Sequence, residues 1–207
     1  ALEVAGELLH TVDVTPPLDL HGDGLTVGIA TQQVDGTDVG GELAPHQRQP
    51  GGERRRMVGE GLLEVLLHAV LPQPWVDPER VGVWGWSGGG MFTLVALTRS
   101  KEFKAGIAVA PGTDWRFYDT KFTEAYMKPP AENPDGYEHT SLVSRAKDLH
   151  GRLLLVFGTY DDNVHPQNSW AFVDEAVKAG IPFDLMAYPM RKHGIEDRPA
   201  RIHLYEK

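Results

Sequence analysis

Residues 80–99 of the chain read RVGVWGWSGGGMFTLVALTR, and they predict a strand, a sharp turn and a helix in succession. The first part, Arg80–Gly85, is a continuous apolar run, which is typical of a strand buried on both faces of a sheet. The last part, Gly90–Arg99, has the spacing of a helix. The segment between them, GWSGG, fits the pattern G-x-S-x-G, in which a serine lies on a tight turn that larger neighbours would block. The stretch therefore predicts Ser87 as a nucleophile.

Three more apolar runs and one amphipathic segment continue this alternation toward the carboxyl end. Buried strands are predicted at Lys104–Ala110, Arg152–Phe157 and Phe183–Tyr188, and a helix is predicted at Asn168–Ala179. The helix carries Trp170, Val173 and Val177 on one apolar stripe. Gly180 follows at the position of a C-terminal cap. Strands that alternate with helices indicate an α/β fold with a mainly parallel sheet.

The first 75 residues carry a weaker pattern than residues 76–207, and we expect the N-terminal strands to be missing or irregular. Thr26–Thr31 fits one strand, and Met57–Leu71 fits a helix that Pro72 ends. Gln32–Arg56 is rich in Gly, Pro, Gln and Arg and has little apolar periodicity. A connection of that length without structure is uncommon inside a compact domain. We still expect a single domain over residues 1–207, because a chain of this length normally forms one.

Composition excludes several kinds of protein. The 207 residues include 20 Lys and Arg against 29 Asp and Glu, so the formal net charge is −9 and nucleic-acid binding is not expected. Cysteine is absent, which excludes disulfides and thiolate chemistry. The longest apolar stretch, Gly61–Leu71, contains Glu64 and His68 and is too short to span a membrane.

No signal or targeting segment is visible, and the sequence does not decide between a cytoplasmic and a periplasmic or secreted location. The chain begins at Ala1 rather than Met, and it ends at Lys207 inside a predicted helix. We therefore expect it to be a fragment or a trimmed chain.

An acid and a base follow the last two predicted strands. Arg152–Phe157 runs into Asp161 and Asp162, and Phe183–Tyr188 runs into His193. A serine hydroxyl becomes nucleophilic when a base accepts its proton and a third group orients that base. The order serine, acid, histidine at successive strand ends predicts a catalytic triad with His193 as the base and one of the two aspartates as the acid.

A metal site is the alternative interpretation of this region. His165 lies close in sequence to Asp161 and Asp162, and together they form a partial ligand set. A firm site needs more ligands at fixed spacing, so neither a metal nor an organic cofactor is expected.

Four segments carry a resemblance to a known family. They are Val81–Gly90 (VGVWGWSGGG), Phe103–Met127 (FKAGIAVAPGTDWRFYDTKFTEAYM), Phe157–Gln167 (FGTYDDNVHPQ) and Tyr188–Ile195 (YPMRKHGI). Together they resemble the catalytic domain of the prolyl oligopeptidase family of serine peptidases, and the dipeptidyl peptidase IV branch most of all. The resemblance implies an α/β-hydrolase fold, with Ser87 as the nucleophile, Asp161 as the acid, His193 as the base and the Gly88 N–H as an oxyanion donor.

The same resemblance implies a pocket for a proline-like side chain. Trp115, Tyr118 and Phe122 would line the pocket, and Asn163 and Val164 would flank it. Aromatic faces suit a flat apolar ring. The alternative is that these aromatic side chains belong to the core.

The chain departs from the family pattern in two respects. Gly88 stands where the family has a tyrosine. The family's second oxyanion donor is an upstream tyrosine, whereas the first of the six tyrosines here is Tyr118. Loss of one oxyanion donor lowers turnover by about 10²- to 10³-fold. His21–Gly24 (HGDG) is weakly similar to the loops that supply such donors in esterases.

The sequence contains no counterpart of the β-propeller that precedes the hydrolase domain in the family, so we expect small activated esters to react more readily than peptides. Two other functions therefore stay open. One is a small carboxylesterase or lactonase on the same fold, and the other is an inactive fragment or interaction module. Peptides or small esters are the expected substrates, and a homodimer is expected by analogy with the family.

Overall fold

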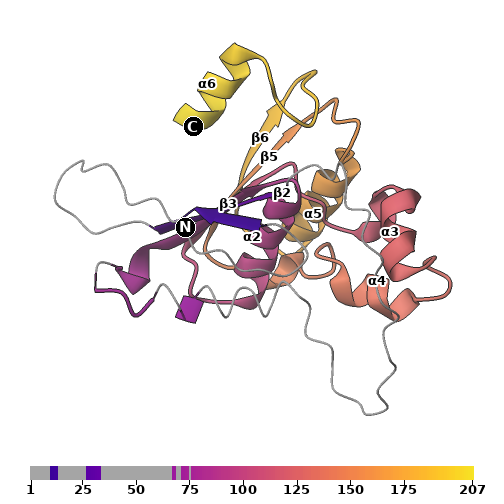
Figure 1. The fold of residues 1–207 in the computed structure, drawn as a ribbon, viewed down its shortest axis with the longest axis horizontal. Helices are drawn as coiled ribbons and strands as arrows, with labels where there is room; N and C mark the ends of the chain where they lie inside the picture. The colour runs from indigo at the N-terminus through magenta and orange to yellow at the C-terminus, as the bar shows by residue number, and fades with distance from the viewer. Residues whose placement is uncertain (1–9, 14–26, 34–66, 69–70, 75) are drawn as a thin grey trace, which may run out of the picture.

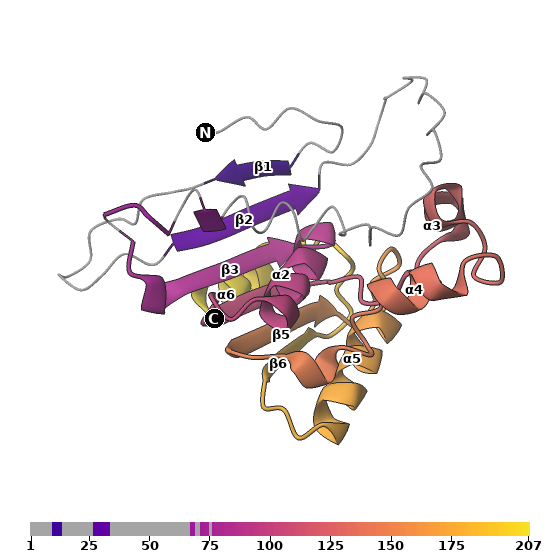
Figure 2. The same ribbon diagram turned by 90° about the horizontal axis from the view of Figure 1, so that it is seen from below.

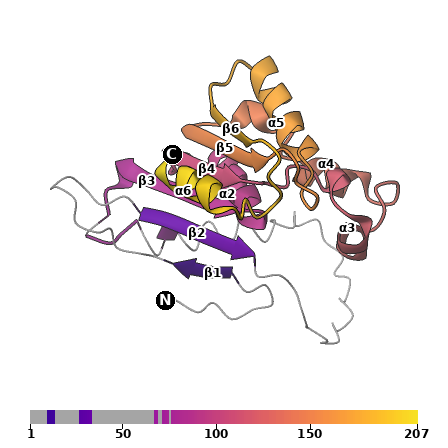
Figure 3. The same ribbon diagram turned by 90° about the horizontal axis from the view of Figure 1, so that it is seen from above.

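The computed structural model describes residues 10–13, 27–33, 67–68, 71–74 and 76–207, and in the first two ranges it describes the backbone alone. The described strands form one sheet in the order β1-β2-β3-β4-β5-β6. Their bounds are β1 (His10–Asp13), β2 (Val27–Gln33), β3 (Val81–Trp86), β4 (Ala105–Val109), β5 (Arg152–Gly158) and β6 (Asp184–Tyr188). β1 is antiparallel to β2, and every other neighbouring pair is parallel, which confirms the predicted mainly parallel sheet. Figure 3 shows β1 and β2 at the edge away from β5 and β6.

Helices and short 3-10 turns connect the strands. They are η1 (Pro78–Arg80), α2 (Gly88–Arg99), η2 (Trp115–Phe117), α3 (Thr120–Met127), α4 (Pro134–Thr140), η3 (Ala146–Asp148), α5 (Gln167–Lys178) and α6 (Arg198–Glu206). The predicted strand-turn-helix at residues 80–99 is confirmed by β3 and α2. Two of the helices, α3 and α4, lie beyond the carboxyl ends of the strands (Figures 1 and 2). The connection from β4 to β5 therefore forms a cap over that end of the sheet.

Two apolar clusters cover the two faces of the sheet. On one face, α2 and α5 pack with η3 against residues of β3, β4 and β5, and Leu94, Leu97 and Phe172 are almost fully buried there. Close approach of α2 to β4 depends on Gly106, where a Cβ atom would lie 2.6 Å from the Leu97 Cδ1. On the other face, α6 packs near the carboxyl ends of the strands, on a cluster that includes Trp86.

The structure corrects two predictions about burial. In β4, which we predicted to be buried on both faces, Ile107 is 41% exposed, because the apolar cluster under α6 on that face includes Val109 but not Ile107. In α5, Trp170 and Val177 are 47% and 63% exposed, whereas Phe172 and Ala176 are buried. The buried stripe of α5 thus lies beside the predicted one on the helix surface. The predicted cap at Gly180 is confirmed by its positive φ of 70°.

The N-terminal predictions fall largely outside the described residues. β2 confirms a strand close to Thr26–Thr31, and Leu67–His68 are helical within the predicted helix at Met57–Leu71. The remainder of that helix, almost all of Gln32–Arg56, and His21–Gly24 lie outside the described ranges. In the part of the chain that the structure describes, no helix combines the length and apolar character that a membrane span requires.

Candidate active site

Ser87 lies on a sharp turn between β3 and α2. Its backbone has φ 58° and ψ −117°, a conformation that residues with a side chain rarely adopt. The turn is held in place because the Ser87 N–H donates to the Val109 carbonyl at 2.8 Å. A Cβ atom on Gly85 would overlap the carbonyl group of Gly89, so glycine is required at that position. The predicted steric reason for the first glycine of the G-x-S-x-G pattern is confirmed.

Replacement of Gly85 by alanine is expected to distort this turn. The added methyl group has no free space, so we expect a loss of about 3 kcal/mol in unfolding free energy together with loss of reactivity at Ser87. Gly82→Ala is the matched control on the same strand, because its added Cβ would lie 3.6 Å from its nearest neighbour, the Ala105 carbonyl oxygen. Urea denaturation of both variants measures the difference, and equal stability of the two would contradict the steric argument.

Gly88 is the first residue of α2 and lines a pocket together with Ser87. The first N–H groups of a helix have no carbonyl partner within the helix, and the helix dipole makes this end positive. The Gly88 N–H is therefore suited to receive negative charge that develops on an oxygen beside Ser87.

His193 and Asp161 form a direct pair. The His193 Nδ1 lies 2.8 Å from the Asp161 Oδ2. The Asp161 side chain is fully buried, and its other oxygen, Oδ1, accepts from the backbone N–H groups of Asn163 at 2.9 Å and Val164 at 3.0 Å. Both carboxylate oxygens are thus engaged, so the carboxylate has a fixed direction and can orient the imidazole.

Asp162 has a different environment from Asp161. It is exposed and pairs with Lys192, whose Nζ lies 2.5 Å from the Asp162 Oδ2. The hydrogen bond from Lys192 lowers the pKa of Asp162 below its usual value. The acid that contacts His193 is therefore Asp161 and not Asp162, a choice that strand order alone left open.

The metal alternative gains no support from the geometry. Within the ranges that the structure describes, no group of three or more His, Asp or Glu side chains is placed to hold an ion. His165 is exposed and follows Asp161 and Asp162 in the sequence.

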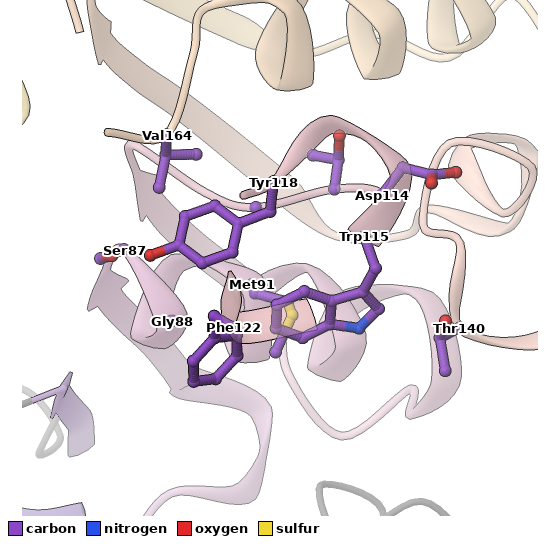
Figure 4. A pocket seen from close by; sticks show the side chains of 11 residues that line it. Ser87, Gly88, Met91, Asp114, Trp115, Tyr118, Phe122, Thr140 and Val164 are labelled. Carbon is purple, nitrogen blue, oxygen red and sulfur yellow. The ribbon is translucent and has the colours of Figure 1, made fainter. Parts of the chain in front are cut away.

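An aromatic pocket opens beside Ser87 (Figure 4). The ring centroids of Trp115, Tyr118 and Phe122 lie 5.7–6.1 Å from one another. Trp115 and Tyr118 are half-buried and Phe122 is 36% exposed, so these rings line a cavity and are not core residues. The lining residues are Ser87, Gly88, Met91, Gly112, Thr113, Asp114, Trp115, Tyr118, Phe122, Thr140 and Val164.

Asn163 is the one predicted pocket residue that does not line this cavity. It contacts the pocket indirectly, because the Tyr118 hydroxyl donates to the Asn163 Oδ1 at 3.2 Å. Sequence reasoning missed Met91, Asp114 and Thr140 as lining residues. Asp114 precedes Trp115 directly, and an acidic residue beside a pocket aromatic was the signal available for it.

Asp114 supports the turn that carries Trp115. Its side chain is 2% exposed, and both of its oxygens accept from the Arg116 guanidinium, at 2.8 and 2.6 Å. The Ser141 hydroxyl also donates to the Asp114 Oδ2 at 2.7 Å. Burial opposes ionisation, but the hydrogen bonds from Arg116 and Ser141 outweigh it and lower the pKa of Asp114. The charged carboxylate therefore fixes η2 and holds the Trp115 ring at the pocket.

The chain is similar to known proteins. The model of the prolyl oligopeptidase family matches residues 62–207. Over 139 residues the chain is 44% identical to dipeptidyl-aminopeptidase B of Aspergillus niger, and the match covers 65% of this chain and 15% of that protein. The crystal structure of Porphyromonas gingivalis dipeptidyl peptidase 4 is similar with a TM-score of 0.69 and 46% sequence identity, over 72% of this chain and 21% of that one.

These matches bear on the fold and on the family in different ways. The structural likeness identifies the sheet and its helices as an α/β-hydrolase fold, which confirms the predicted fold class. The chain spans about a fifth or less of the length of each of these relatives. The family match covers most of the chain, including the strained serine turn, the acid–histidine pair and the aromatic pocket, and so the chain belongs to the prolyl oligopeptidase family.

Proposed function

We propose that the chain is the catalytic part of a serine peptidase of the dipeptidyl peptidase type, which cleaves peptides after proline. The observation that carries the proposal is one pocket that holds the strained Ser87 and Gly88 together with three aromatic rings. The relatives support the substrate class, because one is named dipeptidyl-aminopeptidase B and the other dipeptidyl peptidase 4.

In the proposed reaction, the Ser87 Oγ attacks the carbonyl carbon of the scissile bond. The His193 Nε2 takes the hydroxyl proton, while Asp161 keeps the His193 Nδ1 protonated through the 2.8 Å hydrogen bond. The carbonyl oxygen becomes an oxyanion that accepts from the Gly88 N–H. As the carbon–nitrogen bond breaks, His193 gives the proton to the leaving amine, which leaves an ester between the acyl group and Ser87.

Deacylation repeats these steps with water as the nucleophile. His193 takes a proton from the water, and the hydroxide adds to the ester carbonyl. Collapse of the second tetrahedral species returns the proton from His193 to the Ser87 Oγ and releases the carboxylic acid. The residues are thus restored to their starting protonation states.

The aromatic rings account for a preference for proline. A pyrrolidine ring is flat, apolar and lacks a donor, so it gains most from contact with Trp115, Tyr118 and Phe122. Tyr118 is held in place through its hydroxyl by Asn163, and in Figure 4 its ring extends across the pocket toward Ser87. The side chain before the scissile bond would therefore lie beside the nucleophile.

Truncation of the aromatic side chains in the pocket is expected to slow the hydrolysis of a prolyl substrate but not that of a small ester. We expect Trp115→Ala and Phe122→Ala to lower kcat/KM for Ala-Pro p-nitroanilide by about 10- to 100-fold, because each removes apolar contact with the ring. Hydrolysis of p-nitrophenyl acetate, whose acetyl group does not fill the pocket, is expected to change by less than about threefold. Steady-state kinetics on both substrates measures the split.

Tyr205→Ala is the control for this experiment, because Tyr205 is exposed on α6 and does not line the pocket. An equal loss on both substrates in the Trp115 and Phe122 variants would contradict the assignment of the pocket. Turnover of the ester with none of the prolyl anilide by the unmodified chain would favour the carboxylesterase instead.

A further inference from the structure

Three consecutive carbonyl groups beside His193 accept hydrogen bonds from two side chains. The Trp86 Nε1–H donates to the His193 carbonyl at 2.9 Å. Arg201 on α6 donates to the next two carbonyls, from Nη2 to Gly194 at 2.9 Å and from Nε to Ile195 at 2.9 Å. The Arg201 guanidinium also lies 5.2 Å from the centre of the Trp86 ring, which is cation–π contact distance. The two side chains therefore act on the same backbone segment and on each other.

This segment has a backbone that needs external support. The His193 loop, defined here as residues 189–197, contains Met190 with φ 61° and Ile195 with φ 43°. Positive φ is unfavourable for a β-branched residue such as isoleucine, and it persists where surrounding contacts hold the chain. Ile195 is 1% exposed, so its buried side chain and the bonds from Arg201 and Trp86 hold that side of the loop.

The opposite side of the loop is anchored separately to the end of β5. The Met190 N–H donates to the Thr159 Oγ1 at 2.9 Å, and the Tyr160 N–H donates to the Arg191 carbonyl at 3.0 Å. His193 thus lies between two anchored stretches. Of these anchors, Trp86 is the one that is covalently adjacent to Ser87.

We propose that Trp86 and Arg201 are positioning residues that hold His193 at a working distance from Ser87. This inference rests on the proposed function. Trp86 is the last residue of β3 and directly precedes Ser87, and its indole N–H donates to the His193 carbonyl. One side chain therefore links the backbone of the nucleophile to the backbone of the base. Arg201 stacks on the indole and binds the two following carbonyls, which keeps both the ring and the loop in place.

The test uses the rate at which a fluorophosphonate labels Ser87 in the 207-residue chain. Trp86→Phe keeps a ring for Arg201 but removes the N–H donor, and Arg201→Met removes the donors to the Gly194 and Ile195 carbonyls. We expect each variant to label about 10-fold or more slowly, since small displacements of catalytic groups have effects of this size. The losses in the double variant are expected to be less than multiplicative, because both changes release the same loop.

Two further readouts separate positioning from simple destabilisation. With p-nitrophenyl acetate, we expect kcat to fall while KM changes little. In proton NMR, we expect the low-field resonance of the His193 Nδ1–H to shift or broaden in both variants.

Arg201→Lys is expected to restore part of the labelling rate, because it keeps the positive charge over the Trp86 ring. Arg198→Met, on the exposed side of the same helix, is the matched control and is expected to label at the unmodified rate.

Labelling of Trp86→Phe and Arg201→Met within about twofold of the unmodified rate would overturn the inference, as would a loss that follows the unfolded fraction alone. If the unmodified chain does not label, the proposed function fails, and the NMR resonance then decides about positioning. A resonance that is the same in all the variants overturns the inference, and one that changes in Trp86→Phe and Arg201→Met but not in Arg198→Met supports it.

Discussion

Ser87→Ala is expected to lower the hydrolysis of p-nitrophenyl acetate by a factor on the order of 10⁶, to the rate that binding and the oxyanion site alone supply. The reason is chemical, since alanine has no hydroxyl with which to form the acyl-enzyme. Stability is expected to change little, because the Ser87 side chain makes no capping hydrogen bond to the helix that follows. Steady-state kinetics and thermal denaturation of the variant measure the two effects.

Ser100→Ala provides the control at the other end of the same helix. Ser100 is the C-cap residue of α2 and is far from the pocket lining. We expect it to retain the full rate. Retention of more than about one hundredth of the rate in Ser87→Ala would show that another group is the nucleophile.

Asp161→Asn is expected to lower turnover by about 10⁴-fold while the chain stays folded. The backbone N–H groups of Asn163 and Val164 donate to one oxygen of the carboxylate, so the amide oxygen of asparagine would take that place. The amide NH₂ would then face the His193 Nδ1 and donate to it. The imidazole would carry its proton on Nε2, where it cannot accept the proton of Ser87.

Asp162→Asn is a matched control for this prediction. Asp162 is adjacent in sequence but exposed, and it pairs with Lys192 rather than with His193. An exposed ion pair contributes little to stability, so we expect a change of less than about threefold in turnover. Equal losses in the two asparagine variants would contradict the assignment of Asp161 as the orienting acid.

Much of the fold was predictable from the sequence because its strands and helices are local patterns. The apolar runs of β3, β4, β5 and β6 lie between turn residues, and the glycines around Ser87 have one steric explanation. Burial within these elements was less predictable. The face that α5 presents depends on its partner, and here Phe172 and Ala176 face the sheet while Trp170 packs edge-on against Phe157 at 5.0 Å.

The candidate site likewise has a part that the sequence predicts and a part that it does not. Asp161 and His193 could be found because each follows a strand, and parallel strands bring their carboxyl ends together. Hydrogen bonds between residues that are distant in the sequence could not be predicted in this way. The hydrogen bond from Trp86 to the His193 carbonyl spans 107 residues, and the Ser141 hydroxyl, at the C-cap of α4, donates to Asp114. Such contacts depend on the tertiary arrangement and leave no local pattern.

Labelling of the unmodified chain with a fluorophosphonate, followed by mass spectrometry of the modified peptide, tests the central claim most directly. The claim is that Ser87, His193 and Asp161 form an assembled nucleophile beside the aromatic pocket. We predict one label per chain, on the peptide that contains Ser87, and none after Ser87→Ala. A folded chain that stays unlabelled, or a label on another residue, would contradict the account.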